Sequence, residues 1–114
     1  MPASKQQIID FLNESFPQAN CQVDSVGDQQ AVVSHHIGED ELRPGGTVSG
    51  PVLMKVADVA LYVAILGEIG IVGLAVTTNL NINFLRKPSG GVDLRGVCKL
   101  MKVGQALIVG EVWI

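Results

Sequence analysis

One acidic side chain, Asp58, lies in the middle of the most apolar stretch of the chain. Between Val52 and Leu66, thirteen of fifteen residues are apolar or tyrosine, and the exceptions are Lys55 and Asp58. Burying a carboxylate is costly, so its presence here needs a reason. One reason is general-base chemistry, in which a carboxylate takes a proton from attacking water. The other is structural: Lys55 precedes Asp58 by three residues on a helix and could pair with it, with Tyr62 completing the network.

The residues that flank this stretch are typical of helix ends. Ser49 and Gly50 are followed by Pro51, which is favoured in the first turn of a helix, and Gly67 follows the last apolar residue. The pattern predicts a helix that ends at Gly67. Because the helix is apolar on nearly all sides, we expect it to be buried. It is too short and too charged to span a bilayer, which needs ~20 apolar residues.

Composition narrows the class of protein. A chain of 114 residues predicts a single domain over 1–114. Apolar residues make up 47% and charged residues 17%, a high ratio for a small monomer, so we expect a homo-oligomer that buries part of the excess between subunits. The net charge of -3 provides no basic surface for nucleic acid.

The cysteines and the start of the chain concern location. Cys21 and Cys98 lack the spacing of a metal site or a redox pair, which is typical of proteins in a reducing compartment. The first residues lack the basic and apolar regions of a signal peptide. Both features predict a cytoplasmic protein.

The first third of the chain predicts one helix and two strands. Residues Ser4–Phe16 form a capped amphipathic pattern, with Ile9, Leu12 and Phe16 as its packing face. Residues Cys21–Val26 and Gln30–Ile37 then alternate as two strands around a turn.

Two neighbouring histidines, His35 and His36, lie on the second of these strands. Successive side chains of a strand point to opposite faces, so the two cannot bind one metal ion together, and we expect no metal site. The acidic segment Gly38–Leu42 follows and is expected to be a solvated loop. Segment Arg43–Pro51 is rich in Gly and Pro, but it lacks the spacing of a phosphate-binding loop.

After the central helix, a long strand is expected over Leu74–Leu85. One face of it carries Thr77, Asn79 and two further asparagines, which predicts either a solvated outer face or a row of polar residues facing a ligand or a subunit. Arg86 and Lys87 follow in a basic turn that could attract an anionic group.

The chain closes with a pair of strands over Val92–Val103 and Gln105–Ile114. The second strand stops without any turn signal, and an unpaired apolar edge invites aggregation. We therefore expect either a further strand beyond Ile114 or pairing with another chain.

Two segments together resemble the PaaI-like acyl-CoA thioesterases of the hotdog superfamily. The first begins with Ser49 and Gly50 and reaches Ala57 and Asp58 on the central helix; the second is the strand end at Asn79–Arg86, followed by proline. The resemblance implies an α+β hotdog fold, in which an antiparallel sheet wraps around one long central helix, with a short N-terminal helix.

The resemblance extends over about Cys21 to Ile114, and two departures matter. The family has His where this chain has Ser49, and Gly where it has Pro51. The family also has one more strand after the point where this chain ends, so the resemblance implies a hotdog domain that is truncated at its C-terminus.

The resemblance also implies an activity and a site. It implies hydrolysis of acyl-CoA thioesters, with Asp58 as general base or nucleophile, the Gly50 N–H as oxyanion donor and Thr77 as a polar group from the partner subunit. Substrate-binding residues would be Ser49, Asn79, Arg86 and Lys87, the last two for coenzyme A phosphates. The site would lie between the subunits of a homodimer or a dimer of dimers. Coenzyme A would enter only as part of the substrate, without a cofactor, metal or membrane.

Three other functions remain open from the sequence. A non-catalytic acyl-CoA binding dimer is favoured by the loss of the family His at Ser49. A hotdog hydratase or dehydratase would need a histidine, and only His35 and His36 are available. The end at Ile114 would also fit a truncated, inactive product.

Overall fold

The computed structural model describes residues 3–38, 41–44, 46–70, 93–103 and 108–113. Its elements, in chain order, are α1 (Lys5–Ser15), η1 (Pro17–Ala19), β1 (Gln22–Gly27), β2 (Gln30–His36), β3 (Leu42–Arg43), β4 (Thr47–Val48), α2 (Gly50–Ile69), β5 (Asp93–Val103) and β6 (Ile108–Trp113). The expected helices, the first two strands and the last strand pair are therefore confirmed. The long strand expected over Leu74–Leu85 lies outside the described residues.

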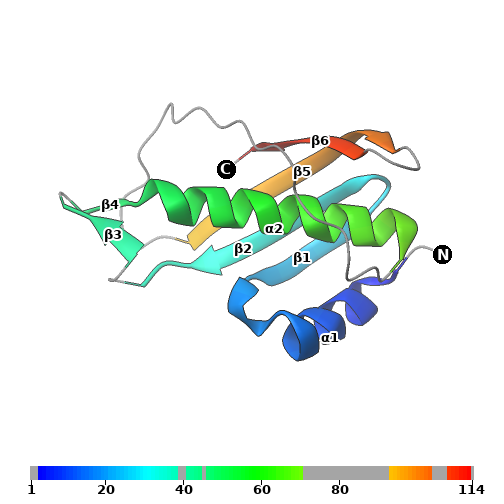
Figure 1. Cartoon of the computed structure of the whole chain (residues 1–114), viewed down its shortest axis with the longest axis horizontal. Helices are drawn as coiled ribbons and strands as arrows, with labels where there is room; N and C mark the ends of the chain where they lie inside the picture. The colour runs from blue at the N-terminus through cyan, green and yellow to red at the C-terminus, as the bar shows by residue number, and fades with distance from the viewer. Residues whose placement is uncertain (1–2, 39–40, 45, 71–92, 104–107, 114) are drawn as a thin grey trace.

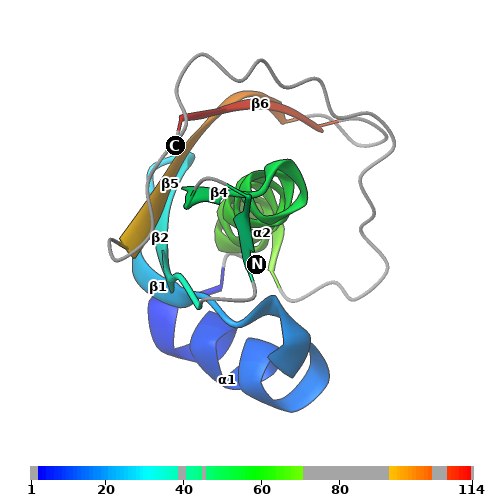
Figure 2. The same ribbon diagram turned by 90° about the vertical axis from the view of Figure 1, so that its left-hand side faces the viewer.

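Antiparallel pairing joins four of the described strands into one sheet, in the order β1-β2-β5-β6. The sheet curves around α2, and α1 packs beside β1 (Figure 1, Figure 2). β3 and β4 form a separate two-stranded ribbon at the start of α2 (Figure 1). This arrangement is the α+β hotdog architecture expected from the sequence.

The N-terminal helix is capped as its sequence predicts. The Ser4 hydroxyl accepts a hydrogen bond from the Gln7 N–H at 3.2 Å, and the Gln7 side chain accepts one from the Ser4 N–H at 2.9 Å. The expected packing face needs a correction. Ile8 and Leu12 are the buried residues, whereas Ile9 and Phe16 are only half-buried.

The central helix is buried, but it is longer than predicted. Nine of its residues are buried, and Gly67 lies inside the helix rather than after it. The helix ends at Ile69, and its C-cap residue Gly70 has a φ of 97°, which favours glycine. The prediction that Gly67 ends the helix is wrong because this glycine meets a packing requirement: a Cβ there would lie 2.5 Å from Cγ2 of Val26 in β1.

The two histidines point to opposite faces of β2, as alternation predicts. His35 is 1% exposed and His36 is exposed. His35 bonds to Glu41: its Nε2 lies 2.9 Å from Oε1 and 2.7 Å from Oε2 of the carboxylate. The Glu41 side chain is only 19% exposed, so the prediction of a solvated acidic loop over Gly38–Leu42 is wrong at this residue. Its carboxylate provides the hydrogen-bond partner that the buried imidazole of His35 requires.

The environment of Glu41 lowers the pKa of its carboxyl group. Burial alone would raise this pKa, but hydrogen bonds from the Gly38 N–H and from His35, and the charges of His35 and Lys55, outweigh burial. The ionised carboxylate is therefore favoured in the folded chain.

We expect a double-mutant cycle to detect the close contact between Gly67 and Val26 as a coupling free energy. Gly67→Ala should destabilise the protein by about 1–2 kcal/mol, because the added Cβ overpacks against Val26. In a Val26→Ala background the same change should stabilise by up to about 1 kcal/mol, because Ala is the better helix former. Urea unfolding measures both values, and equal effects in the two backgrounds would contradict the contact.

We also expect the lowered pKa of Glu41 to make stability depend on pH. A carboxyl group whose pKa is lower in the folded state contributes stability that is present above its ordinary pKa, about 4.5, and is lost as the pH falls through the lowered value. The free energies of unfolding of wild type and Glu41→Gln should therefore converge below about pH 4.5. Urea titrations between pH 6 and 3 test this; parallel curves would show that Glu41 is not the source.

Candidate functional site

The start of α2 presents backbone donors without a side-chain cap. Ser49 is the N-cap residue, with φ -69° and ψ 151°, and its side chain makes no capping hydrogen bond. Its carbonyl accepts the Leu53 N–H at 3.3 Å, and its own N–H donates to the Glu41 carbonyl at 2.9 Å. Gly50 is the first helical residue, so its amide belongs to the turn whose N–H groups have no acceptor within the helix. These amides carry partial positive charge and suit a developing oxyanion.

Asp58 lies eight residues further along the same helix. Its side chain is half-buried, between the buried residues Ala57 and Val59. Lys55 is also half-buried. The helix thus carries one acidic side chain, Asp58, and one basic side chain, Lys55, that water can reach among neighbours that are mostly apolar. A half-exposed carboxylate can accept a proton from water, which a sealed one could not.

The other predicted site residues are not all in the described part of the chain. Ser49, Gly50 and Asp58 lie on or next to α2, as expected. Thr77, Asn79, Arg86 and Lys87 lie outside the described residues.

Glu41 is a neighbour of the site that the sequence did not predict. Its carboxylate binds His35, and its carbonyl binds the N-cap residue Ser49. The alternation of β2 predicts that His35 and His36 lie on opposite faces, and the structure shows that His35 is the buried one. A buried imidazole requires polar partners, and the acidic segment that follows is where such a partner could have been sought.

Burial affects three further titratable groups near the central helix. It raises the pKa of the half-buried Cys21 thiol, although the charge of Lys55 opposes this, and raises the pKa of the buried Cys98 thiol to about 11. Both thiols are free. Burial also raises the pKa of Tyr62, whose ring packs against those of Phe11 and Phe16 at centroid distances of 6.4 and 6.3 Å. Raised thiol pKa values disfavour the thiolate, so neither cysteine has the character of a nucleophile.

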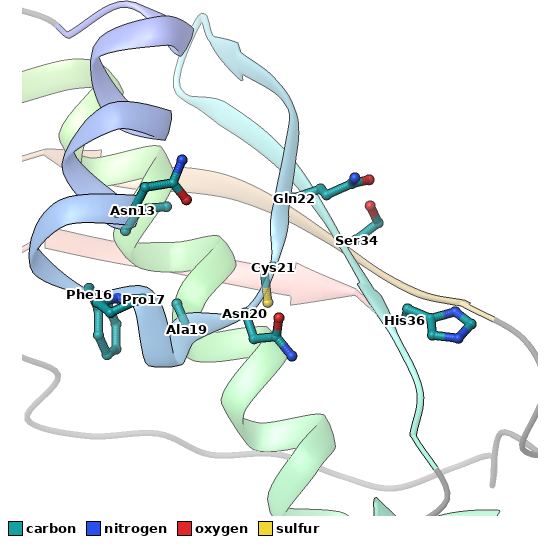
Figure 3. Close-up of a pocket in the computed structure, with 10 residues that line it drawn as sticks. Asn13, Phe16, Pro17, Ala19, Asn20, Cys21, Gln22, Ser34 and His36 are labelled. Carbon is teal, nitrogen blue, oxygen red and sulfur yellow. The ribbon is translucent and has the colours of Figure 1, made fainter.

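A cavity of about 410 Å³ opens where α1 and η1 meet the first two strands (Figure 3). Its lining includes Phe16, Asn20, Cys21, Ser34 and His36. Neither Gly50 nor Asp58 lines it, so this cavity is separate from the start of α2.

In the described ranges, no group of three or more His, Cys, Asp or Glu side chains is placed to hold a metal ion. Neither of the described α-helices is long and apolar enough to cross a bilayer.

Comparison with known proteins identifies the family. The family model described as "Thioesterase superfamily" matches residues 45–114, which is more than half of the chain. No curated protein matches the sequence.

Solved structures agree with the family match. A provisionally assigned thioesterase from Silicibacter sp. TM1040 has 40% sequence identity and a TM-score of 0.86, over 96% of this chain and 77% of that one. The E. coli PaaI protein from the phenylacetic acid degradation operon has 21% identity and a TM-score of 0.71, over 89% and 75% of the two chains.

A thioesterase from Streptococcus pneumoniae TIGR4, described as hypothetical, was solved with coenzyme A. It has 21% identity and a TM-score of 0.76, over 92% of this chain and 80% of that one. At this identity it supports the fold alone. The family match and the antiparallel sheet wrapped around a central helix lead to one conclusion: the chain belongs to the thioesterase superfamily and has the hotdog fold.

Proposed function

We propose that this chain hydrolyses acyl-CoA thioesters to a free acid and coenzyme A. The observation that carries the proposal is Asp58, a half-buried carboxylate on the central helix. It lies eight residues after the first residue of that helix, whose first turn contains no acidic residue. Thioester hydrolysis is the chemistry that membership of the family supports.

The proposed reaction uses the two features of α2 in sequence. Water attacks the thioester carbonyl while the Asp58 carboxylate takes its proton, and the carbonyl oxygen becomes an oxyanion. The Gly50 N–H stabilises this oxyanion together with the positive end of the helix. The C–S bond then breaks, the thiolate of coenzyme A leaves and takes up a proton, and the acid is released.

Helix geometry favours a site shared by two chains. Eight residues of α-helix separate Gly50 from Asp58 by about 12 Å along the axis. If both groups came from one chain, three contacts of about 3 Å each would have to cover this distance: Gly50 N–H to carbonyl oxygen, carbonyl to water, and water to Asp58. These contacts would have to lie almost in a straight line. We therefore propose a homodimer, or a dimer of dimers, in which the partner's Asp58 acts beside Gly50 of this chain. Thr77 of the partner subunit would complete the polar site.

Substrate binding is proposed for residues around this site. Ser49 and Asn79 would contact the thioester end, and Arg86 and Lys87 would bind coenzyme A phosphates. The coenzyme A in the structure of the S. pneumoniae neighbour is the reason for proposing a coenzyme A ester as the substrate to test. Water activation by a carboxylate needs no cofactor. The two free thiols fit a cytoplasmic location.

We expect Asp58→Asn to abolish hydrolysis. The amide is the same size but cannot take a proton from water, so kcat should fall at least about 100-fold on any acyl-CoA that wild type cleaves. A panel of acyl-CoAs of increasing chain length, with an aromatic one, read by thiol release, measures this.

Glu68→Gln is the matched control for that variant. Glu68 lies near the other end of α2, where its carboxylate accepts the Gln29 N–H at 3.1 Å, and the variant should keep its activity. Undiminished hydrolysis by Asp58→Asn would remove the basis of the mechanism. If wild type binds coenzyme A esters without cleaving them, a non-catalytic binding dimer, consistent with Ser49 in place of the family His, becomes the function.

We expect two inactive variants to restore activity when their subunits are mixed. Gly50→Pro lacks the N–H proposed to bind the oxyanion, and Asp58→Asn lacks the base. In a mixed dimer, one of the two sites combines an intact Gly50 with an intact partner Asp58. Random mixing of equal amounts should recover about a quarter of the wild-type rate, because half of the dimers are mixed and each has one intact site. No recovery from folded, mixed dimers would place both groups of a site on one chain.

A further inference from the structure

A network of polar contacts joins β2 to the segment that leads into α2. His35 is buried in β2, and both of its ring nitrogens have partners. Nδ1 lies 2.8 Å from the carbonyl oxygen of Asn20, and Nε2 lies 2.7 Å from Oε2 of Glu41. The Glu41 carboxylate also accepts the Gly38 N–H at 2.8 Å, while the Glu41 N–H donates to the Gly38 carbonyl at 3.1 Å.

The chemistry of these partners determines where the protons lie. A carbonyl oxygen only accepts, so Nδ1 of His35 must donate to Asn20. One further proton must lie between Nε2 and the Glu41 carboxylate, because two acceptors cannot bond to each other. Either position of this proton gives a hydrogen bond that holds Glu41 in one orientation. Asn20 contributes through its left-handed backbone, with φ 50°, a conformation that asparagine tolerates better than most residues.

Glu41 transmits this anchoring to the helix start through its main chain. Its carbonyl accepts the Ser49 N–H at 2.9 Å, immediately next to the β3–β4 ribbon, in which Leu42 pairs with Val48. Ser49 is the N-cap residue of α2, and Gly50 follows it. The imidazole of His35 is thus connected through Glu41, by a hydrogen bond on each side, to Ser49, the residue that precedes the proposed oxyanion donor.

We propose that His35 and Glu41 are a positioning pair, which holds the start of α2 so that the Gly50 amide is correctly placed for the oxyanion. This inference rests on the proposed function. An oxyanion donor works only if it already lies where the charge will develop. The Ser49 side chain makes no capping hydrogen bond, so the position of this turn depends more heavily on the Glu41 contact.

Variants at Glu41 separate positioning from general stability. Glu41→Ala removes the carboxylate and should lower kcat by about 10- to 100-fold, the cost of misplacing a reacting group by about an ångström, while KM changes less than about twofold. Glu41→Gln should recover most of the loss. Its amide can accept the Gly38 N–H and donate to a neutral His35, which reproduces both contacts.

Glu68→Ala is the matched control, since it removes a carboxylate that accepts a backbone N–H at the far end of the same helix. It should leave kcat unchanged. Amide hydrogen exchange gives a readout that does not depend on catalysis. In Glu41→Ala, exchange should accelerate at Ser49 and Leu53 but not in the buried turn around Val63.

The outcomes distinguish this inference from the proposed function. If wild type cleaves acyl-CoAs and Glu41→Ala retains its kcat, the positioning pair is refuted and the thioesterase activity stands. If wild type cleaves none of them, the thioesterase proposal fails, and exchange alone decides whether the pair holds the helix start. Faster exchange throughout Glu41→Ala, or the same kcat loss in Glu68→Ala, would show a global loss of stability and overturn the inference.

Discussion

Close contact between α2 and the sheet that curves around it determines where polar groups can lie in this protein. Val56 and Ala60 are fully buried, and a Cβ at Gly96 of β5 would lie 3.1 Å from the first and 3.4 Å from the second. Contact this close excludes water and makes an unpaired charge costly. Polar groups are therefore tolerated on the helix only near its exposed sides and its ends, and these are the places where Lys55, Asp58 and the helix start lie.

The same constraint explains how much of the fold could be predicted from the sequence. The apolar run of α2 predicts a buried helix because few other environments accept it. Alternation in β2 likewise predicts that His35 and His36 lie on opposite faces, although only the structure shows that His35 is the buried one. The end of α2 could not be predicted, because Gly67 is in the helix for its lack of a Cβ against Val26, a contact between residues 41 positions apart.

The candidate site was only partly predictable for a related reason. Asp58 is conspicuous because a carboxylate is rare in an apolar helix, and the resemblance to PaaI-like thioesterases added Ser49 and Gly50. Glu41 is not conspicuous, since it lies among other acids, and composition favours a solvated loop. Its role depends on a partner six residues earlier, whose need for an acceptor becomes evident only once His35 is known to be buried. Local composition cannot reveal an interaction that burial creates.

Ser49 stands where the family has His, and the contacts of its main chain show how the first turn of α2 is held in place. A residue at the N-cap can stabilise the first turn through its own side chain, typically by about 1 kcal/mol, but Ser49 does not. The first turn is held through the main chain: the Ser49 N–H binds the Glu41 carbonyl, and the Glu41 side chain is fixed by His35. This arrangement leaves the Ser49 hydroxyl without a capping role, and the first turn of α2 contains no acidic residue. The loss of the family His therefore need not mean the loss of an ordered oxyanion site, because order at this turn can come from the sheet beneath it.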